Sequence, residues 1–298
     1  MREVMYVKGE YTSLGAYDCL INALLFWMQG QSLSSTSLCL YNWDFHTSAT
    51  KPFLFGGTIH ISSIQSFMKE RHGVEIMEID GELPVDEPFI MALDAYCLPY
   101  IEEFYGKKRQ PHFVVAERRS TQRNYQIYDS YYRVSMSLSE DLAEKGSAMS
   151  GKPGYRMRVE GAASTCTATI FPYMLDRDYE KVYRVSRLWM TAQALTFESL
   201  GAALKEAEAF KKFFSCLRGV TRARERYFEA LRVGDLPWRE MTEAGPDVVG
   251  KWLAVEKNMI RMTLDFTTGY VLFLNSLDKA FERETAFLKT LEKIKRES

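Results

Sequence analysis

A long apolar segment near the start of the chain constrains the fold more than any other feature. Residues 20–28 are apolar at every position except Asn22. A helix that is apolar on all of its faces must be surrounded by other parts of the protein. Asp18, which precedes the segment, is a residue type that caps the first turn of helices. The pattern therefore predicts a central, buried helix with Cys19 in its first turn.

Cys19 is a candidate nucleophile because of its place at the head of this helix. A thiol reacts as its thiolate, which the positive end of a helix and a neighbouring imidazole both stabilise. His112 and Asp129 follow later in the chain, which gives the order thiol, imidazole, carboxylate. The imidazole can take the proton of the thiol, and the carboxylate can fix the imidazole's tautomer. Cys19, His112 and Asp129 are therefore the predicted catalytic residues.

The two partners of Cys19 are predicted to lie at one end of a β-hairpin. Residues 113–116 and 125–128 fit strands, and the polar and basic residues between them fit a turn. His112 opens the first strand and Asp129 ends the second, so antiparallel pairing would bring them together. A structural interpretation stays open, because cysteine is among the residues most often buried for packing alone.

The chain also resembles a family of biosynthetic enzymes. The run IMALDAYCLPY at residues 90–100, followed by His112 and by residues 125–129, is similar to the N-terminal domain of butirosin biosynthesis protein H. The early Asp-Cys pair at the head of an apolar helix matches that family as well. The family resembles the papain-like superfamily, near the peptidases that cut double-glycine leaders, and the match covers roughly residues 10–135.

The resemblance implies an α+β, papain-like cysteine-protease fold, with a central helix against an antiparallel sheet. It implies an acyltransferase that takes an acyl group from a carrier-protein or coenzyme A thioester onto Cys19 and passes it to an amine. His112 would act as base and then as acid, and Asp129 would orient it. The product would be an amide of a specialised, antibiotic-type metabolite. The expected partners are an acyl carrier protein and a small amine acceptor, with phosphopantetheine on the substrate and no bound cofactor.

One departure from the papain-like pattern leaves alternatives open. Such enzymes commonly place a glutamine about six residues before the cysteine as an oxyanion donor, and this chain has Ser13 there, with Thr12 beside it. Ser13, Thr12 or Asn22 would then supply a donor together with the Cys19 backbone N–H, or the oxyanion hole is incomplete. The alternatives are a cysteine peptidase, a thioester hydrolase or cyclase, and a catalytically silent papain-like scaffold that binds a partner.

Composition argues against several other classes of protein. The net charge of −1 gives no electrostatic basis for binding nucleic acid or an anionic membrane. Five cysteines without a C-x-x-C pair and four histidines without ligand spacing argue against a disulfide framework and a metal site. Neither a signal peptide nor an apolar membrane span is evident, so a cytoplasmic location is expected. The basic residues at 107–109 and 118–119 fit solvated loops, or alternatively a surface that steers an acidic carrier protein.

The pattern predicts a catalytic domain at residues 1–185 and a helical domain at residues 186–298. The first domain has an amphipathic helix at 61–71, two further strands at 74–79 and 89–93, and a short helix at 138–145 followed by a loop through 151–154. In the second domain, apolar residues recur at steps of three or four. There Gly219 is predicted to end one helix, Pro246 to begin another, and Gly269 to mark a break.

Overall fold

The structure, a computed structural model, describes residues 19–33, 38, 47–48, 51–55, 61–160, 201, 207–233 and 239–297. The fold is α+β, as predicted. The chain divides into two compact units, one formed by residues 1–35 and 60–165 and the other by residues 36–59 and 166–298. The predicted domain boundary at 185/186 lies between residues 161 and 200, outside the described residues.

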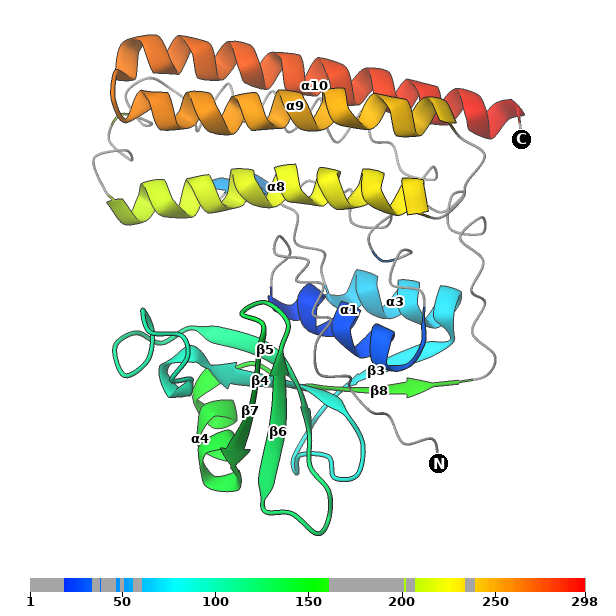
Figure 1. Cartoon of the computed structure of the whole chain (residues 1–298), viewed down its shortest axis with the longest axis vertical. Helices are drawn as coiled ribbons and strands as arrows, with labels where there is room; N and C mark the ends of the chain where they lie inside the picture. The colour runs from blue at the N-terminus through cyan, green and yellow to red at the C-terminus, as the bar shows by residue number, and fades with distance from the viewer. Residues whose placement is uncertain are drawn as a thin grey trace. The chain divides into compact units, whose positions relative to one another are not determined.

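An antiparallel sheet forms the centre of the first unit (Figure 1). Within the described residues it has six strands, in the spatial order β3 (Val74–Glu78), β8 (Tyr155–Val159), β4 (Phe89–Asp94), β5 (Pro111–Glu117), β6 (Asn124–Asp129) and β7 (Val134–Ser139). The predicted strands at β3, β4, β5 and β6 are confirmed. β7 and β8 were not predicted, because the sequence around them was interpreted as a short helix and loops.

Helices cover the sheet of the first unit on both faces (Figure 1). α1 (Cys19–Gly30) packs against β5 and β4, and α3 (Ile61–His72) packs against β3. α4 (Glu140–Ser150) packs against β4, β6 and β7 on the other side. The predicted burial of α1 is confirmed, since seven of its residues are buried: Ile21, Asn22, Ala23, Leu24, Leu25, Trp27 and Met28. The predicted N-cap, Asp18, lies outside the described residues.

The core between the sheet and α4 fixes the position of the strands that carry the candidate site. Leu93 of β4, Val114 of β5 and Ile127 of β6 are fully buried in one cluster with Ala143 of α4. Burying an aliphatic side chain of this size contributes about 1.5–3 kcal/mol. The hairpin of β5 and β6 is therefore held by the core along its length, which leaves the ends of its strands in fixed positions.

Three long helices make up most of the described part of the second unit: α8 (Ala207–Val233), α9 (Arg239–Met262) and α10 (Phe266–Glu297). Consecutive helices run in opposite directions, and α9 packs against both α8 and α10 (Figure 1). A small hairpin, β1 (Thr47–Ser48) and β2 (Lys51–Phe55), belongs to the same unit, and β2 contacts α8.

The helix boundaries in this unit correct the sequence-based prediction. α8 continues through Gly219, because the buried stripe of Leu217, Val220 and Ala223 runs across it. Pro246 lies inside α9 and does not begin it. The chain turns at residues 263–265, before Gly269, and Gly269 sits where an added Cβ would lie 2.6 Å from the backbone of Met262.

A buried polar cluster joins all three helices of the bundle. Arg224 of α8 and Glu284 of α10 are both fully buried and form an ion pair with 2.5 Å between Nε and Oε1. Trp252 of α9 donates its indole N–H to the same Glu284 oxygen at 2.7 Å.

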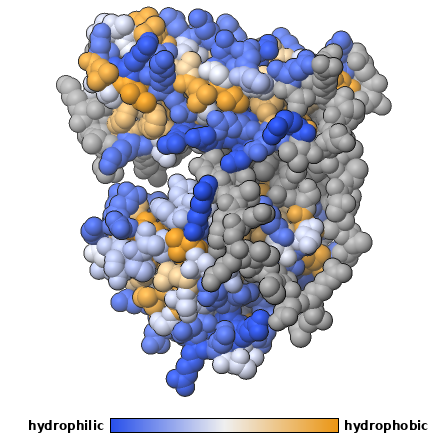
Figure 2. Space-filling model, in the orientation of Figure 1, coloured by the Kyte–Doolittle hydropathy of each residue, from blue (hydrophilic) through white to orange (hydrophobic). Residues whose placement is uncertain are grey.

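Apolar side chains also lie on the surface of the bundle (Figure 2). The large exposed ones on α9, α10 and the turn between them are Leu253, Ile260, Leu264 and Val271. No helix within the described ranges is both long enough and apolar enough to cross a membrane.

Candidate active site

Cys19 is the first residue of α1 and is partly exposed. Its position places the thiol at the positive end of a helix of 12 residues. Seven of the other residues of α1 are buried, so packing holds the helix while its first residue remains accessible. This is the location in which a helix dipole favours an anionic sulfur.

His112 and Asp129 lie in contact at one end of the predicted hairpin. β5 and β6 pair antiparallel, with Val115 opposite Tyr128. His112 Nε2 lies 2.6 Å from Asp129 Oδ2, and the two residues are 6% and 1% exposed. A hydrogen bond this short between an imidazole and a carboxylate is typical of a charge-assisted pair.

The Cys19 thiol lies near enough to the same imidazole that its hydrogen bonding and charge are among the causes that raise the pKa of His112. Because Nε2 faces Asp129, the ring nitrogen that remains for the thiol is Nδ1. The structure thus brings Cys19, His112 and Asp129 together in the order sulfur, imidazole, carboxylate. Such an arrangement can move a proton off the thiol and keep the imidazole in one orientation.

The charge state of His112 follows from competing effects. Burial alone would lower the pKa of His112, but the hydrogen bonds and charges of Asp129 and Cys19 outweigh it and raise the pKa to about 9. The imidazole is therefore largely protonated at neutral pH. A protonated imidazole next to a thiol favours the thiolate form of that thiol.

Asp129 is held by more donors than His112 alone. Its Oδ1 accepts hydrogen bonds from the backbone N–H groups of Tyr131 and Tyr132, at 2.9 and 3.1 Å. Its Oδ2 accepts a bond from the Tyr100 hydroxyl at 2.9 Å, beside the one from His112. Four donors thus fix the carboxylate in one orientation.

Three tyrosine rings surround His112 and Asp129. The ring centroids of Tyr131 and Tyr132 lie 6.2 and 5.5 Å from the centroid of His112 and 4.9 Å from each other. Tyr131 is 41% exposed and Tyr132 is 37% exposed. Tyr100 contacts Tyr132 edge to face. A substrate that reaches the imidazole would therefore contact aromatic surface.

The turn after Asp129 also ties the hairpin to α1. Ser130 is buried and donates its hydroxyl to the backbone carbonyl of Asn22 at 3.0 Å. This bond connects the chain directly after the carboxylate to the first turn of the helix that carries Cys19. The bond helps to fix the position of the Cys19 thiol relative to His112 and Asp129.

The predicted oxyanion donors are only partly described. Ser13 and Thr12 lie outside the described residues. Asn22 is buried in α1, one helical turn after Cys19. Its contribution as an oxyanion donor stays a prediction.

The basic residues near His112 are engaged in local contacts. Arg109 forms an ion pair with the buried Asp94 at 3.0 Å, and Lys107 donates to the backbone carbonyl of Glu102. Arg118 pairs with Glu140 and lies over the ring of Tyr125. Residues 107–109 are exposed, which fits the predicted solvated loop. Their role in steering a carrier protein stays a prediction.

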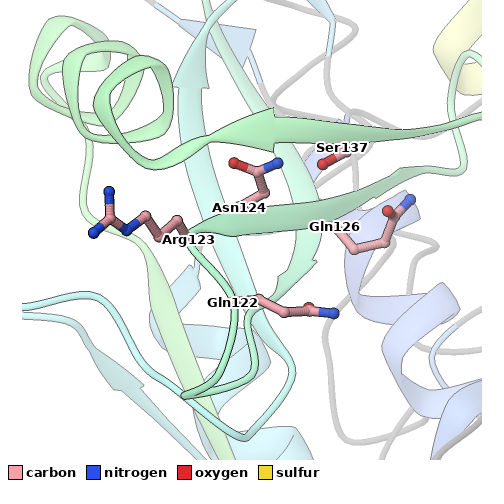
Figure 3. A pocket seen from close by; sticks show the side chains of 5 residues that line it. All are labelled: Gln122, Arg123, Asn124, Gln126 and Ser137. Atoms are coloured by element: carbon pink, nitrogen blue, oxygen red, sulfur yellow. The ribbon is translucent and has the colours of Figure 1, made fainter.

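A separate polar pocket lies on strands β6 and β7 and the turn before β6 (Figure 3). The residues that line it are Gln122, Arg123, Asn124, Gln126 and Ser137. None of the three predicted catalytic residues is among them, so we place the candidate site on the sulfur, imidazole and carboxylate and not on this pocket. Among the described residues, no group of three or more histidine, cysteine or acidic side chains could hold a metal ion.

Sequence reasoning missed Tyr100, Ser130, Tyr131 and Tyr132 as parts of the site. A local signal was present for the last two. An aspartate often accepts the backbone N–H two residues later in an Asx turn, which is what Asp129 does with Tyr131. Tyr100 ends the run at residues 90–100 that carries the family resemblance, but nothing local indicates that it reaches Asp129 from a different segment of the chain.

Two comparisons with known proteins found no relative of the chain. No protein-family model matches the chain, and no curated protein matches it. The assignment of a function therefore depends on the chemistry of the candidate site and on the short motifs described above.

Proposed function

We propose that the protein is a thiol-dependent acyltransferase. In this proposal Cys19 takes an acyl group from a thioester on a carrier protein or coenzyme A and passes it to an amine. The pathway would be the biosynthesis of a specialised metabolite. The observation that carries the proposal is that one imidazole, His112, is hydrogen bonded to the Asp129 carboxylate and lies near the Cys19 thiol.

The acylation step uses the proton that His112 holds. The Cys19 thiolate attacks the thioester carbonyl carbon and forms a new C–S bond. The bond to the donor sulfur then breaks, and the leaving thiolate takes the proton from the imidazolium of His112. The acyl group now sits on Cys19 as a thioester, and His112 is neutral.

The transfer step reverses these roles. An amine attacks the acyl-Cys19 carbonyl, and neutral His112 accepts the proton that the amine loses. An amide forms, and the bond to Cys19 sulfur breaks to give back the thiolate. If water attacks in place of the amine, the same site acts as a hydrolase, so the two activities differ only in the second nucleophile.

The choice of transfer over peptide cleavage has two supports. The resemblance in residues 90–100, His112 and residues 125–129 is to an acyltransferase family. In addition, the usual oxyanion glutamine position holds Ser13. A thioester carbonyl is easier to attack than a peptide carbonyl, so transfer depends less on a complete oxyanion hole.

The test is acyl-enzyme formation measured by intact mass. The full chain is incubated with acyl thioesters on a carrier protein and on pantetheine, and the adduct is mapped by peptide mass spectrometry. Cys19→Ala and His112→Ala run in parallel. Cys97→Ala is the matched control, because Cys97 lies in the same unit and is buried.

A mass increase on Cys19 that is lost in Cys19→Ala and kept in Cys97→Ala is the expected result. A panel of amines then separates transfer from hydrolysis by whether amide or free acid accumulates. Absence of an adduct with every donor, in a protein whose Cys19 reacts with iodoacetamide no faster than free cysteine, would point instead to a silent scaffold.

A further inference from the structure

Tyr100 connects the candidate site to a separate, rigid part of the first unit. Its hydroxyl donates to Asp129 Oδ2 at 2.9 Å, the same oxygen that accepts His112 Nε2 at 2.6 Å. The other three donors to Asp129 come from the β5–β6 hairpin and the turn that follows it. Tyr100 alone comes from the segment between β4 and β5.

The segment that carries Tyr100 is anchored on both sides. Asp94, which is 1% exposed, accepts the backbone N–H groups of Tyr96 and Gln110, at 3.0 and 3.1 Å. Leu98 and Ile101, which flank Tyr100, are fully or almost fully buried. A donor on so fixed a segment cannot follow small movements of the hairpin, so it sets the position of Asp129.

We propose that Tyr100 is a positioning residue, whose phenol holds Asp129 in place and takes up part of its negative charge. The carboxylate then attracts the proton of His112 less strongly than an otherwise identical carboxylate without this donor. This inference rests on the proposed function for its catalytic meaning, because it explains how a strongly paired imidazole can still release its proton.

The sign of the effect follows from the geometry. The hydroxyl hydrogen of Tyr100 points at the oxygen that faces His112, so its positive charge lies near the imidazolium and disfavours it. Removing the hydroxyl leaves the full charge of Oδ2 to His112. The pKa of His112 is therefore expected to rise when the phenol is lost.

Other groups around the imidazole have to be considered in any titration. Among the described residues, the ionisable groups next to the imidazole are Cys19 of α1, Asp129 of β6, and Tyr131 and Tyr132 of the turn, and Tyr100 is bonded to the carboxylate. Burial, together with the charge and hydrogen bond of Asp129, raises the pKa of Tyr100. Tyr100 thus remains a protonated donor across the pH range in which His112 titrates.

The test is an NMR titration of the histidine side chains in the full chain without substrate. The chain has four histidines, and the His112 signal is assigned by its loss in His112→Gln. The variants are Tyr100→Phe, Tyr105→Phe, Asp129→Asn, and Tyr100→Phe combined with Asp129→Asn. Tyr105→Phe is the matched control, because Tyr105 lies on the same segment and is 49% exposed. Thermal unfolding checks that each variant folds.

Tyr100→Phe is expected to raise the pKa of His112 by about 0.5–1, since a hydrogen bond to a charged group is strong and only part of its effect acts on His112. Tyr105→Phe should leave it unchanged. In the Asp129→Asn background, adding Tyr100→Phe should have no effect, because the residue acts through Asp129.

An unchanged or lowered pKa of His112 in Tyr100→Phe would overturn the inference, and so would a rise that persists in the Asp129→Asn background. A purely structural role predicts a lower melting temperature with no change in the His112 titration. The titration needs no acyl donor, so a failure of the acyl-enzyme experiment leaves this result unaffected and the two proposals fail separately.

Discussion

The pairing of His112 with Asp129 predicts that the stability of the first unit depends on pH in a defined direction. The pKa of His112 is raised from 6.5 to about 9 in the folded protein. The folded state therefore holds a proton that the unfolded state loses as the pH rises above 6.5. The stabilisation is fully present below pH 6.5 and is lost as the pH rises through about 9.

The size of this effect follows from the two pKa values. They differ by about 2.5, which at 1.36 kcal/mol for each pH unit corresponds to about 3 kcal/mol. His112 is only 6% exposed, so solvent screening reduces this value little. With an m-value of about 1–3 kcal/mol per molar urea, the urea midpoint of the first unit should fall by about 1–3 M between pH 6.5 and 9.

The assay has to report on the first unit alone. Cys97 is 4% exposed and lies in that unit, so brief thiol labelling at each urea concentration, read by peptide mass spectrometry, measures its unfolding. The variant Asp129→Asn removes the negative charge beside His112 and is compared with wild type. In that variant only the effect of Cys19 opposes the burial that lowers the pKa of His112, so the midpoint should depend on pH above 6.5 much less than in wild type.

The quantity to compare is the pH dependence of the urea midpoint in wild type and in Asp129→Asn, because all other titrating groups are common to both proteins. Equal pH dependence in the two proteins would refute the reasoning. So would a wild-type midpoint that rises with pH over this range, since that would mean that His112 is neutral in the folded state.

Three further predictions concern contacts inside each of the two units. Glu284→Ala should destabilise the bundle by about 3–5 kcal/mol, because it leaves Arg224 buried without its carboxylate. Circular dichroism melting should show this loss, and Arg224→Met combined with Glu284→Leu should recover most of it; no recovery would contradict the account. Ser130→Ala should lower the urea midpoint for Cys97 labelling by the equivalent of about 1 kcal/mol, since it removes a buried bond to Asn22; an unchanged midpoint would show that this tie is dispensable. Gly73→Ala should cost more than about 1 kcal/mol in the same assay, because Gly73 has φ of +58° and its added Cβ would lie 2.5 Å from the Glu160 carbonyl oxygen; a neutral substitution would argue against this backbone conformation.

The elements that the sequence predicted well are those whose own pattern decides their structure. α1 is apolar at nearly every position, β4 and β5 are short apolar runs, and β6 alternates between more and less buried residues. The meeting of His112 and Asp129 followed from the length of one local hairpin. Each of these inferences needed only neighbouring residues.

The predictions that failed have different causes. Apolar residues alternate with serine in β7 (VSMSLS) and with arginine in β8 (YRMRV), which is the period of a half-buried strand, but the serine- and glycine-rich sequence around them was interpreted as a helix and loops. β7 pairs with β6, and β8 pairs with β3. Gly219 lies within α8 because packing of the stripe around it outweighs the low helix propensity of glycine. Tyr100 reaches Asp129 across 29 residues of sequence, which no periodicity reveals.

The strand order of the sheet also has a consequence for how the chain is made. β8 lies between β3 and β4, and pairs Val74 with Val159. On the ribosome, β3 and β4 are therefore synthesised long before the strand that joins them. Until residue 159 has emerged, each of the two presents an unpaired edge, which is a template for association with other chains. Closing this sheet requires contacts far apart in sequence, so the first unit is expected to fold slowly and after most of its synthesis is complete.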